Sequence, residues 1–101
     1  MEPTYELCEL QESVKQDKFY ICEEARITAA LIGFLDDDIW DCVVNYLNDT
    51  HFYKTMPAKK FAGLMQDVYK ITYQAKRIYI KLQINKGGNG VIVSFKEDES
   101  P

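Results

Sequence analysis

The sequence predicts an α+β protein in which N-terminal helices pack on a C-terminal twisted antiparallel β-sheet. Three observations support this fold class. Apolar residues recur at helical spacing in the first half, as at Leu7, Leu10 and Val14. They alternate with polar residues in residues 77–84, as in a half-buried strand. A glycine-rich turn of the type that joins antiparallel strands follows at 85–90. With 101 residues, the chain is expected to form one domain, 1–101.

Residues 5–33 predict two helices, with a short segment between them. Residues 5–17 form an amphipathic pattern, for which Thr4 is the expected N-cap. The apolar residues 19–21 are interpreted as either a small edge strand or a connector. A second helix is predicted for 23–33, because two glutamates favour its start and Gly33 suits its end.

A third helix is predicted to begin at the acidic run Asp36–Asp38. Aspartates stabilise the positive end of the helix dipole and act as caps, so a cap is favoured over a metal site. The helix is expected to end at Asn48–Asp49. Its predicted buried stripe consists of Ile39, Val43, Tyr46 and Leu47.

The second half predicts four strands. Residues 51–56 and 66–72 are expected to form the first two. In the third, alternate residues from Ile78 to Ile84 face the core, which leaves Tyr79 on the solvated face. The last strand is expected to bury Val91, Val93 and Phe95 and to expose Ile92, Ser94 and Lys96. The terminal residues KEDESP are predicted to fray.

Charge is distributed very unevenly along the chain. Residues 51–96 carry nine lysines and arginines and one acidic residue, a net charge of +8 in a protein whose total is −4. Such asymmetry between the halves indicates that the basic half binds a polyanion. The alternative is an ordinary solvated sheet whose lysines protect edge strands.

Several classes of protein are disfavoured by composition. The three cysteines, Cys8, Cys22 and Cys42, have no C-x-x-C spacing, so a disulfide framework or a zinc site is not expected. No apolar run is long enough to span a membrane, and the acidic start lacks the features of a secretory signal. We therefore expect a cytoplasmic protein that has neither a metal nor a cofactor.

The basic half combines lysines with aromatic residues. Lysines neutralise phosphates and aromatic rings stack on unpaired bases, so this composition favours single-stranded RNA. RNA cleavage additionally needs a group that accepts the 2′-OH proton, a group that donates a proton to the leaving oxygen, and positive charge at the phosphorus. A lysine crowded by cations has a lowered pKa, and a tyrosine near cations is expected to move towards ionisation.

Five short stretches then indicate a family: PTYEL at 3–7, FYKTM at 52–56, QDVY at 66–69, IYIKL at 78–82 and VSFKE at 93–97. In order and spacing they resemble the MqsR family of bacterial toxins, which belongs to the RelE-like ribonucleases. The resemblance covers essentially the whole chain. It implies a sequence-selective mRNA endoribonuclease (mRNA interferase) that cleaves without a metal and is silenced by an MqsA-like antitoxin.

The resemblance also implies a site. Its motif residues fall on Lys54, Gln66, Tyr79 and Lys96. Lys54 and Lys96 are expected to bind phosphate and stabilise charge, Tyr79 to transfer a proton, and Gln66 to position the scissile phosphate or a base. Further RNA contacts are expected from Tyr53, Lys70, Arg77 and Lys81.

The chain departs from the family pattern between the first two motifs. The family usually has a D-H pair and a Trp there, whereas this chain has PAKKFAGL and Met65. The departure bears on base selectivity more than on cleavage. His51, just before the first motif, is interpreted as a surface histidine. Two other functions remain open: a non-catalytic family member that binds RNA or antitoxin, and an interaction domain whose lysines only solubilise the sheet.

Overall fold

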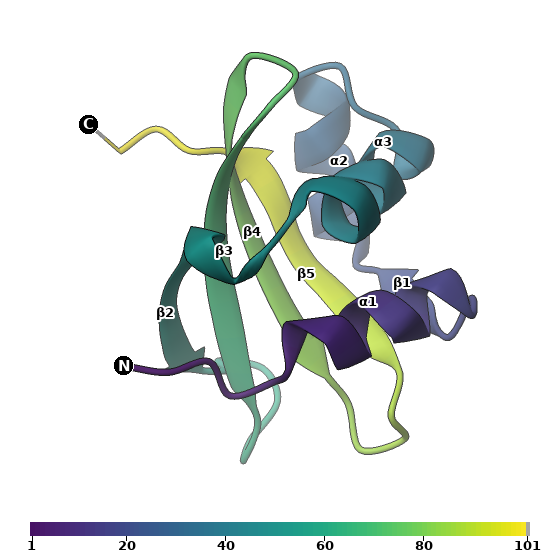
Figure 1. The fold of residues 1–101 in the computed structure, drawn as a ribbon, viewed down its shortest axis with the longest axis vertical. Coiled ribbons are helices and arrows are strands. Elements are labelled where there is room, and N and C mark those ends of the chain that lie inside the picture. The colour runs from purple at the N-terminus through teal and green to yellow at the C-terminus, as the bar shows by residue number, and fades with distance from the viewer. Residues whose placement is uncertain (101) are drawn as a thin grey trace.

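The computed structural model of the chain describes residues 1–100. Within this part of the chain, three α-helices and a five-stranded sheet form the α+β architecture that the sequence predicts (Figure 1). The helices precede most of the sheet, and the arrangement is that of a RelE-like fold. The elements are α1 (Leu7–Lys15), β1 (Phe19–Ile21), α2 (Glu23–Leu31), α3 (Asp36–Asp41), β2 (Phe52–Pro57), β3 (Met65–Tyr73), β4 (Lys76–Ile84) and β5 (Gly90–Glu97).

The strands lie side by side in the order β1-β5-β4-β3-β2. Strands β2 to β5 are antiparallel, whereas β1 pairs in parallel with β5, so residues 19–21 are an edge strand and the sheet is mixed. A two-residue turn joins β3 to β4. Its residues, Gln74 and Ala75, have φ values of 48° and 66°, the left-handed conformations whose twist suits a tight hairpin.

The core lies between one face of the sheet and the helices. Alternate residues of β4, namely Ile78, Ile80 and Leu82, are almost completely buried, as predicted. They pack with helical side chains such as Leu10 and Ile39. Each such side chain contributes roughly 1.5–3 kcal/mol when it is fully buried. The opposite face of the sheet is therefore free to carry polar residues.

A β-bulge changes which residues of β5 face the core. Lys81 lies opposite Ser94, but the next residue, Leu82, lies opposite Ile92, so Val93 is an extra residue. Ile92 is consequently fully buried in the core, whereas Val93 is partly exposed. The prediction is wrong for Ile92 and Val93, because one inserted residue reverses the alternation there, whereas Val91 and Phe95 are fully buried as expected.

The start of α1 also differs from the prediction. The helix begins at Leu7, and Thr4 is not its N-cap. Instead, the backbone N–H groups of Thr4 and Tyr5 donate to the two carboxylate oxygens of Asp67, at 3.0 and 2.9 Å. Because Asp67 is 1% exposed, its carboxylate needs such donors, and they keep residues 4 and 5 outside the helix.

The third helix changes its winding part-way. The aspartates occupy its first turn as predicted, but the N-cap is Leu35, whose backbone N–H donates to the Asp38 carboxylate at 2.9 Å. After Asp41 the chain continues as a π-helical turn, Cys42–Tyr46, which is wider than an α-helical turn. In this wider turn Tyr46 is 57% exposed, so the prediction of a buried Tyr46 is wrong. The rest of the predicted stripe is buried: Ile39, Val43 and Leu47.

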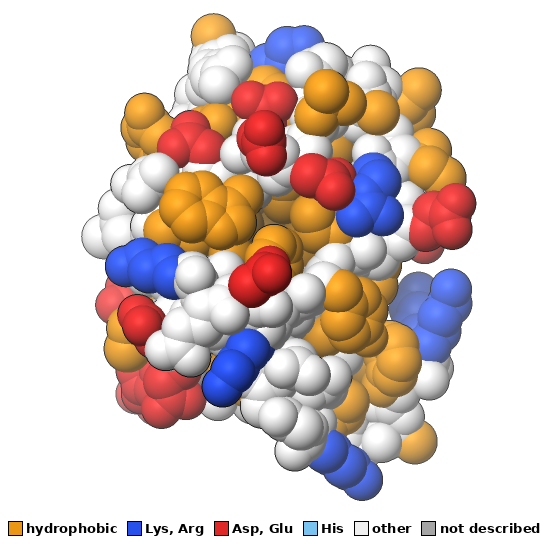
Figure 2. Space-filling view, turned by 90° about the vertical axis from the view of Figure 1, so that its right-hand side faces the viewer, with side chains coloured by type: hydrophobic (Ala, Val, Ile, Leu, Met, Phe, Trp, Pro, Cys, Tyr) orange, Lys and Arg blue, Asp and Glu red, His pale blue; other side chains and the backbone are white. Residues whose placement is uncertain are grey.

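The outer surface of the helical layer is acidic and partly apolar. Figure 2 views this side of the molecule and shows acidic side chains interspersed with apolar ones. Among the exposed apolar side chains are Ile27, Leu31 and Leu35. In the described part of the chain, none of the helices has both the length and the apolar character needed to cross a membrane.

Candidate active site

The predicted site residues lie on the face of the sheet opposite the core, which we call the basic face. Lys54, Gln66, Lys70, Arg77, Tyr79, Lys81 and Lys96 occupy positions that alternate with the core residues of β2 to β5. Tyr79 is at the centre, because its two cross-strand neighbours are Lys70 on β3 and Lys96 on β5. Pairing of the strands thus brings together residues that are up to about forty positions apart in sequence.

Two lysines flank the ring of Tyr79. The Lys96 Nζ atom lies 5.1 Å from the ring centroid and the Lys81 Nζ atom 5.9 Å from it. Tyr53, which is 54% exposed, holds the Lys70 Nζ atom 4.0 Å from its own ring centroid. These are distances at which an aromatic ring attracts a cation. The rings therefore help to gather the positive charges.

Burial raises the pKa of Tyr79, and the neighbouring Tyr53 and Asp98 add to this effect. The expectation that cations move Tyr79 towards ionisation is therefore wrong. Burial disfavours the charged phenolate, and this desolvation is the largest cause of the raised pKa. Tyr79 keeps its proton at neutral pH, which suits a hydrogen-bond or proton donor.

Lys81 shows the lowered pKa that the sequence predicts for a crowded lysine. Its burial is the largest cause, and the positive charges of Lys96, Lys59 and Lys54 lower the pKa further. Glu24, on the first turn of α2, acts in the opposite direction. Lys81 was expected only to contact RNA, but this environment also favours a lysine that accepts a proton.

Gln66 lies on the basic face but is only 5% exposed. Its Nε2 atom donates to the Oε1 atom of Gln83 at 2.8 Å, and Gln83 is itself 1% exposed. Gln83 was missed in the sequence, because a glutamine in a half-buried strand is normally assigned to the solvated side. The pair fixes the orientation of the Gln66 amide beside Lys81 rather than leaving it as a mobile side chain.

The C-terminal segment is docked on the sheet, so the prediction that KEDESP frays is wrong for residues 96–100, whereas Pro101 lies outside the described residues. The Asp98 carboxylate lies 3.6 Å from the Nζ atom of Lys70 and 3.5 Å from Nη2 of Arg77. The Asp98 backbone N–H donates to the carbonyl of Arg77 at 2.8 Å. Hydrogen bonds from Ser100, together with the two cations, lower the pKa of Asp98. Two of the predicted RNA contacts are thus paired with an internal carboxylate.

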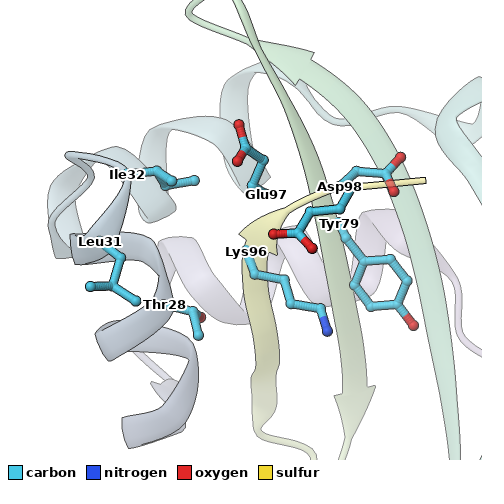
Figure 3. Close-up of a pocket in the computed structure, with 8 residues that line it drawn as sticks. Thr28, Leu31, Ile32, Tyr79, Lys96, Glu97 and Asp98 are labelled. Atoms are coloured by element: carbon cyan, nitrogen blue, oxygen red, sulfur yellow. The ribbon is translucent and has the colours of Figure 1, made fainter. Parts of the chain in front are cut away.

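A pocket of about 530 Å³ opens beside Tyr79 and Lys96. Its opposite wall comes from α2, which lies along β5 and donates a hydrogen bond from Thr28 Oγ1 to the Phe95 carbonyl. Figure 3 shows the Lys96 side chain extending between α2 and the ring of Tyr79. The pocket gives a substrate access to both side chains from the same side.

His51 lies beside the basic face rather than at its centre. Its Nδ1 atom accepts the backbone N–H of Asn48 at 3.1 Å in the turn that precedes β2. This contact holds a turn in place, in agreement with a surface histidine. Within residues 1–100, no group of three or more His, Cys, Asp and Glu side chains is arranged to hold a metal ion.

The fold and the basic face together define a class: small α+β proteins with a cationic sheet face. The chain belongs to the MqsR toxin family, whose model, described as "Motility quorum-sensing regulator, toxin of MqsA", matches residues 2–97. It is therefore a toxin of a toxin–antitoxin system, and an antitoxin is its expected partner. None of the curated proteins matches the chain.

Proposed function

We propose that this toxin is an mRNA endoribonuclease that cleaves single-stranded RNA in the cytoplasm without a metal ion. The observation that carries the proposal is the juxtaposition on one solvated face of a protonated tyrosine, Tyr79, with a lysine of lowered pKa, Lys81. Lys96 lies between them and the pocket wall. The three groups supply an acid, a base and a positive charge, as RNA cleavage requires.

In the proposed reaction, neutral Lys81 accepts the proton of the ribose 2′-OH as this oxygen attacks the adjacent phosphorus. The new P–O2′ bond forms while the P–O5′ bond breaks. Tyr79 donates its proton to the departing 5′ oxygen, and the products are a 2′,3′-cyclic phosphate and a 5′-OH end. Lys54 and Lys96 stabilise the charge that develops on the phosphorane. Gln66, held by Gln83, positions the phosphate or a base.

The experiment is an end-group analysis of a defined single-stranded RNA incubated with the pure protein and EDTA. Wild type should yield discrete fragments with 2′,3′-cyclic phosphate or 3′-phosphate ends, and Lys96→Ala and Lys54→Ala should be at least 100-fold slower. Lys86→Ala, in the exposed turn between β4 and β5, is the matched control and should cleave normally. Equal rates in wild type and Lys96→Ala would refute the proposal. Salt-dependent binding without cleavage would instead favour a non-catalytic RNA-binding function.

The proposed antitoxin is MqsA-like. It could dock on either of two surfaces of the toxin, the basic face of the sheet or the helices. If it covers the basic face, it should bring acidic side chains, because complementary charge favours association. Growth arrest on expression, relieved by co-expression of an MqsA-like protein, tests this pairing in cells. The same arrest should be absent with Lys96→Ala.

A further inference from the structure

A second hollow, of about 500 Å³, opens on the basic face beside the loop that joins β2 to β3. This volume is within the range of sites that hold small ligands. The loop, residues 58–64, is the segment in which the chain departs from the family pattern. The residues that matter for its chemistry come from the loop, from the start of α2 and from the sheet: Lys59, Lys60, Phe61, Glu24, Lys81 and Lys96.

The loop holds Phe61 in a defined position. The Ala58 N–H donates to the Leu64 carbonyl at 2.9 Å, and the Leu64 N–H donates to the Phe61 carbonyl at 3.1 Å. Gly63, with a φ of 83°, provides the left-handed residue that the turn needs. The Phe61 ring remains 37% exposed at the wall of the hollow. An exposed ring on a hydrogen-bonded turn binds a flat ligand with little ordering cost.

Positive charge reaches the hollow from two directions. Lys59 on the loop is close enough to Lys81 to lower the pKa of Lys81. Lys60 lies near Cys22, just before α2, where its charge partly offsets the rise in the thiol pKa that burial causes. The loop therefore extends over the basic face towards the start of α2, and its cations line the same hollow as those of β4 and β5.

We propose that this hollow is a nucleotide subsite, in which an unpaired base stacks on Phe61 while Lys59 and Lys60 bind the adjoining phosphate. A ring beside cations that follow the backbone is the arrangement that binds single-stranded nucleic acid. The neighbouring nucleotide then lies over Lys81, so the subsite sets which base is next to the cleaved bond. Phe61 is the aromatic residue of this loop. The assignment of this nucleotide to a cleaved RNA rests on the proposed function.

Binding of a non-cleavable RNA tests the subsite separately from the chemistry. The probe is a fluorescent 2′-O-methyl oligonucleotide, prepared as a series in which each position in turn lacks its base, and binding is followed by anisotropy. In wild type, one abasic position should weaken binding by roughly five- to 100-fold, the effect of one stacked base. Phe61→Leu should bind the intact oligonucleotide that much more weakly and should lose its sensitivity to this position. Phe61→Trp keeps a ring and should retain both properties.

Tyr20→Leu is the matched control, because Tyr20 is a similarly exposed aromatic residue on β1. It should leave binding unchanged, and the melting temperatures of all three variants should equal that of wild type. Replacing Lys59 and Lys60 by glutamine should reduce the slope of log K against log salt by roughly 1.4.

A Phe61→Leu protein that remains as sensitive as wild type to the loss of that one base, or a wild type that binds none of the oligonucleotides at low salt, would overturn the subsite. Binding that follows the expected pattern while unmodified RNA stays uncut would refute the proposed cleavage and leave the subsite supported.

Discussion

Replacing Lys81 distinguishes two contributions to RNA cleavage, the transfer of a proton and the attraction of phosphate by positive charge. Lys81→Met removes both, whereas Lys81→Arg keeps the positive charge on a group that does not lose its proton. If Lys81 accepts the 2′-OH proton, both variants should cleave RNA roughly 100- to 10,000-fold more slowly, the usual contribution of a general base. If Lys81 only attracts phosphate, arginine should restore most of the rate.

The environment of Lys81 gives the expected pH dependence. An ordinary lysine, with a pKa of about 10.4, is only about 0.04% neutral at pH 7. Each unit by which burial and the cations Lys96, Lys59 and Lys54 lower the pKa multiplies this neutral fraction by about ten. The cleavage rate should therefore rise with pH until the lowered pKa is reached, which lies below that of an ordinary lysine. In Lys81→Arg this rise should disappear.

Stability provides the control for these variants. The pKa of Lys81 is lower in the folded chain than in the unfolded chain. At pH values between these two pKa values, Lys81 is therefore less protonated in the folded chain. At pH values below the folded pKa, Lys81 is protonated in both states and its charge destabilises the folded chain. This destabilisation disappears as the pH rises from the folded to the unfolded pKa. Lys81→Met should thus melt no lower than wild type at pH 7 in a thermal denaturation followed by circular dichroism. A rate of Lys81→Arg within threefold of wild type, with an unchanged pH profile, would refute the assignment of Lys81 as the base.

Three further changes test the surroundings of the site. Asp98→Asn frees Lys70 and Arg77 from their shared carboxylate. It should increase the slope of log K against log salt for 2′-O-methyl RNA by roughly 1.4, as measured by anisotropy. An unchanged slope would mean that these two cations do not bind RNA. Gln83→Leu leaves the buried Gln66 amide without its acceptor and should lower the free energy of unfolding in urea by about 1–3 kcal/mol, whereas replacing both glutamines by leucine should cost less. Asp67→Ala should cost a similar amount and should speed hydrogen exchange at residues 4 and 5; protection equal to wild type would contradict the anchoring role of this carboxylate.

The sequence predicts the fold well wherever a pattern is local. The alternation in β4 identifies which residues are buried and places Tyr79 on the opposite face. This prediction succeeds because no inserted residue interrupts the pairing of β4 with β3. The bulge at Val93 was not predictable from alternation, since it depends on how two strands pair. The π-helical turn at Cys42–Tyr46 shifts a helical stripe in the same way. Both errors result from one inserted residue, and neither insertion can be recognised from the amino-acid composition of its segment.

The candidate site was predictable as a set of residues but not as a set of roles. The motifs identify Tyr79, Lys81 and Lys96 as neighbours on one face, and the strand pairing agrees with this. The direction of a pKa shift depends instead on burial, which sequence spacing does not provide. Docking of Asp98 was missed for a related reason, because the acidic tail contacts strands that lie more than twenty residues earlier in the chain.

The position of β5 in the sheet makes the basic face depend on pairing between residues that are far apart in the sequence. This strand is the last element of the chain, yet it lies inside the sheet, between β1 and β4. It supplies Lys96 and also Phe95, which is fully buried. A nascent chain that lacks β5 has a divided sheet and an open core, and such long-range pairing forms late in folding. Loss of β5 therefore disrupts the core and the basic face together.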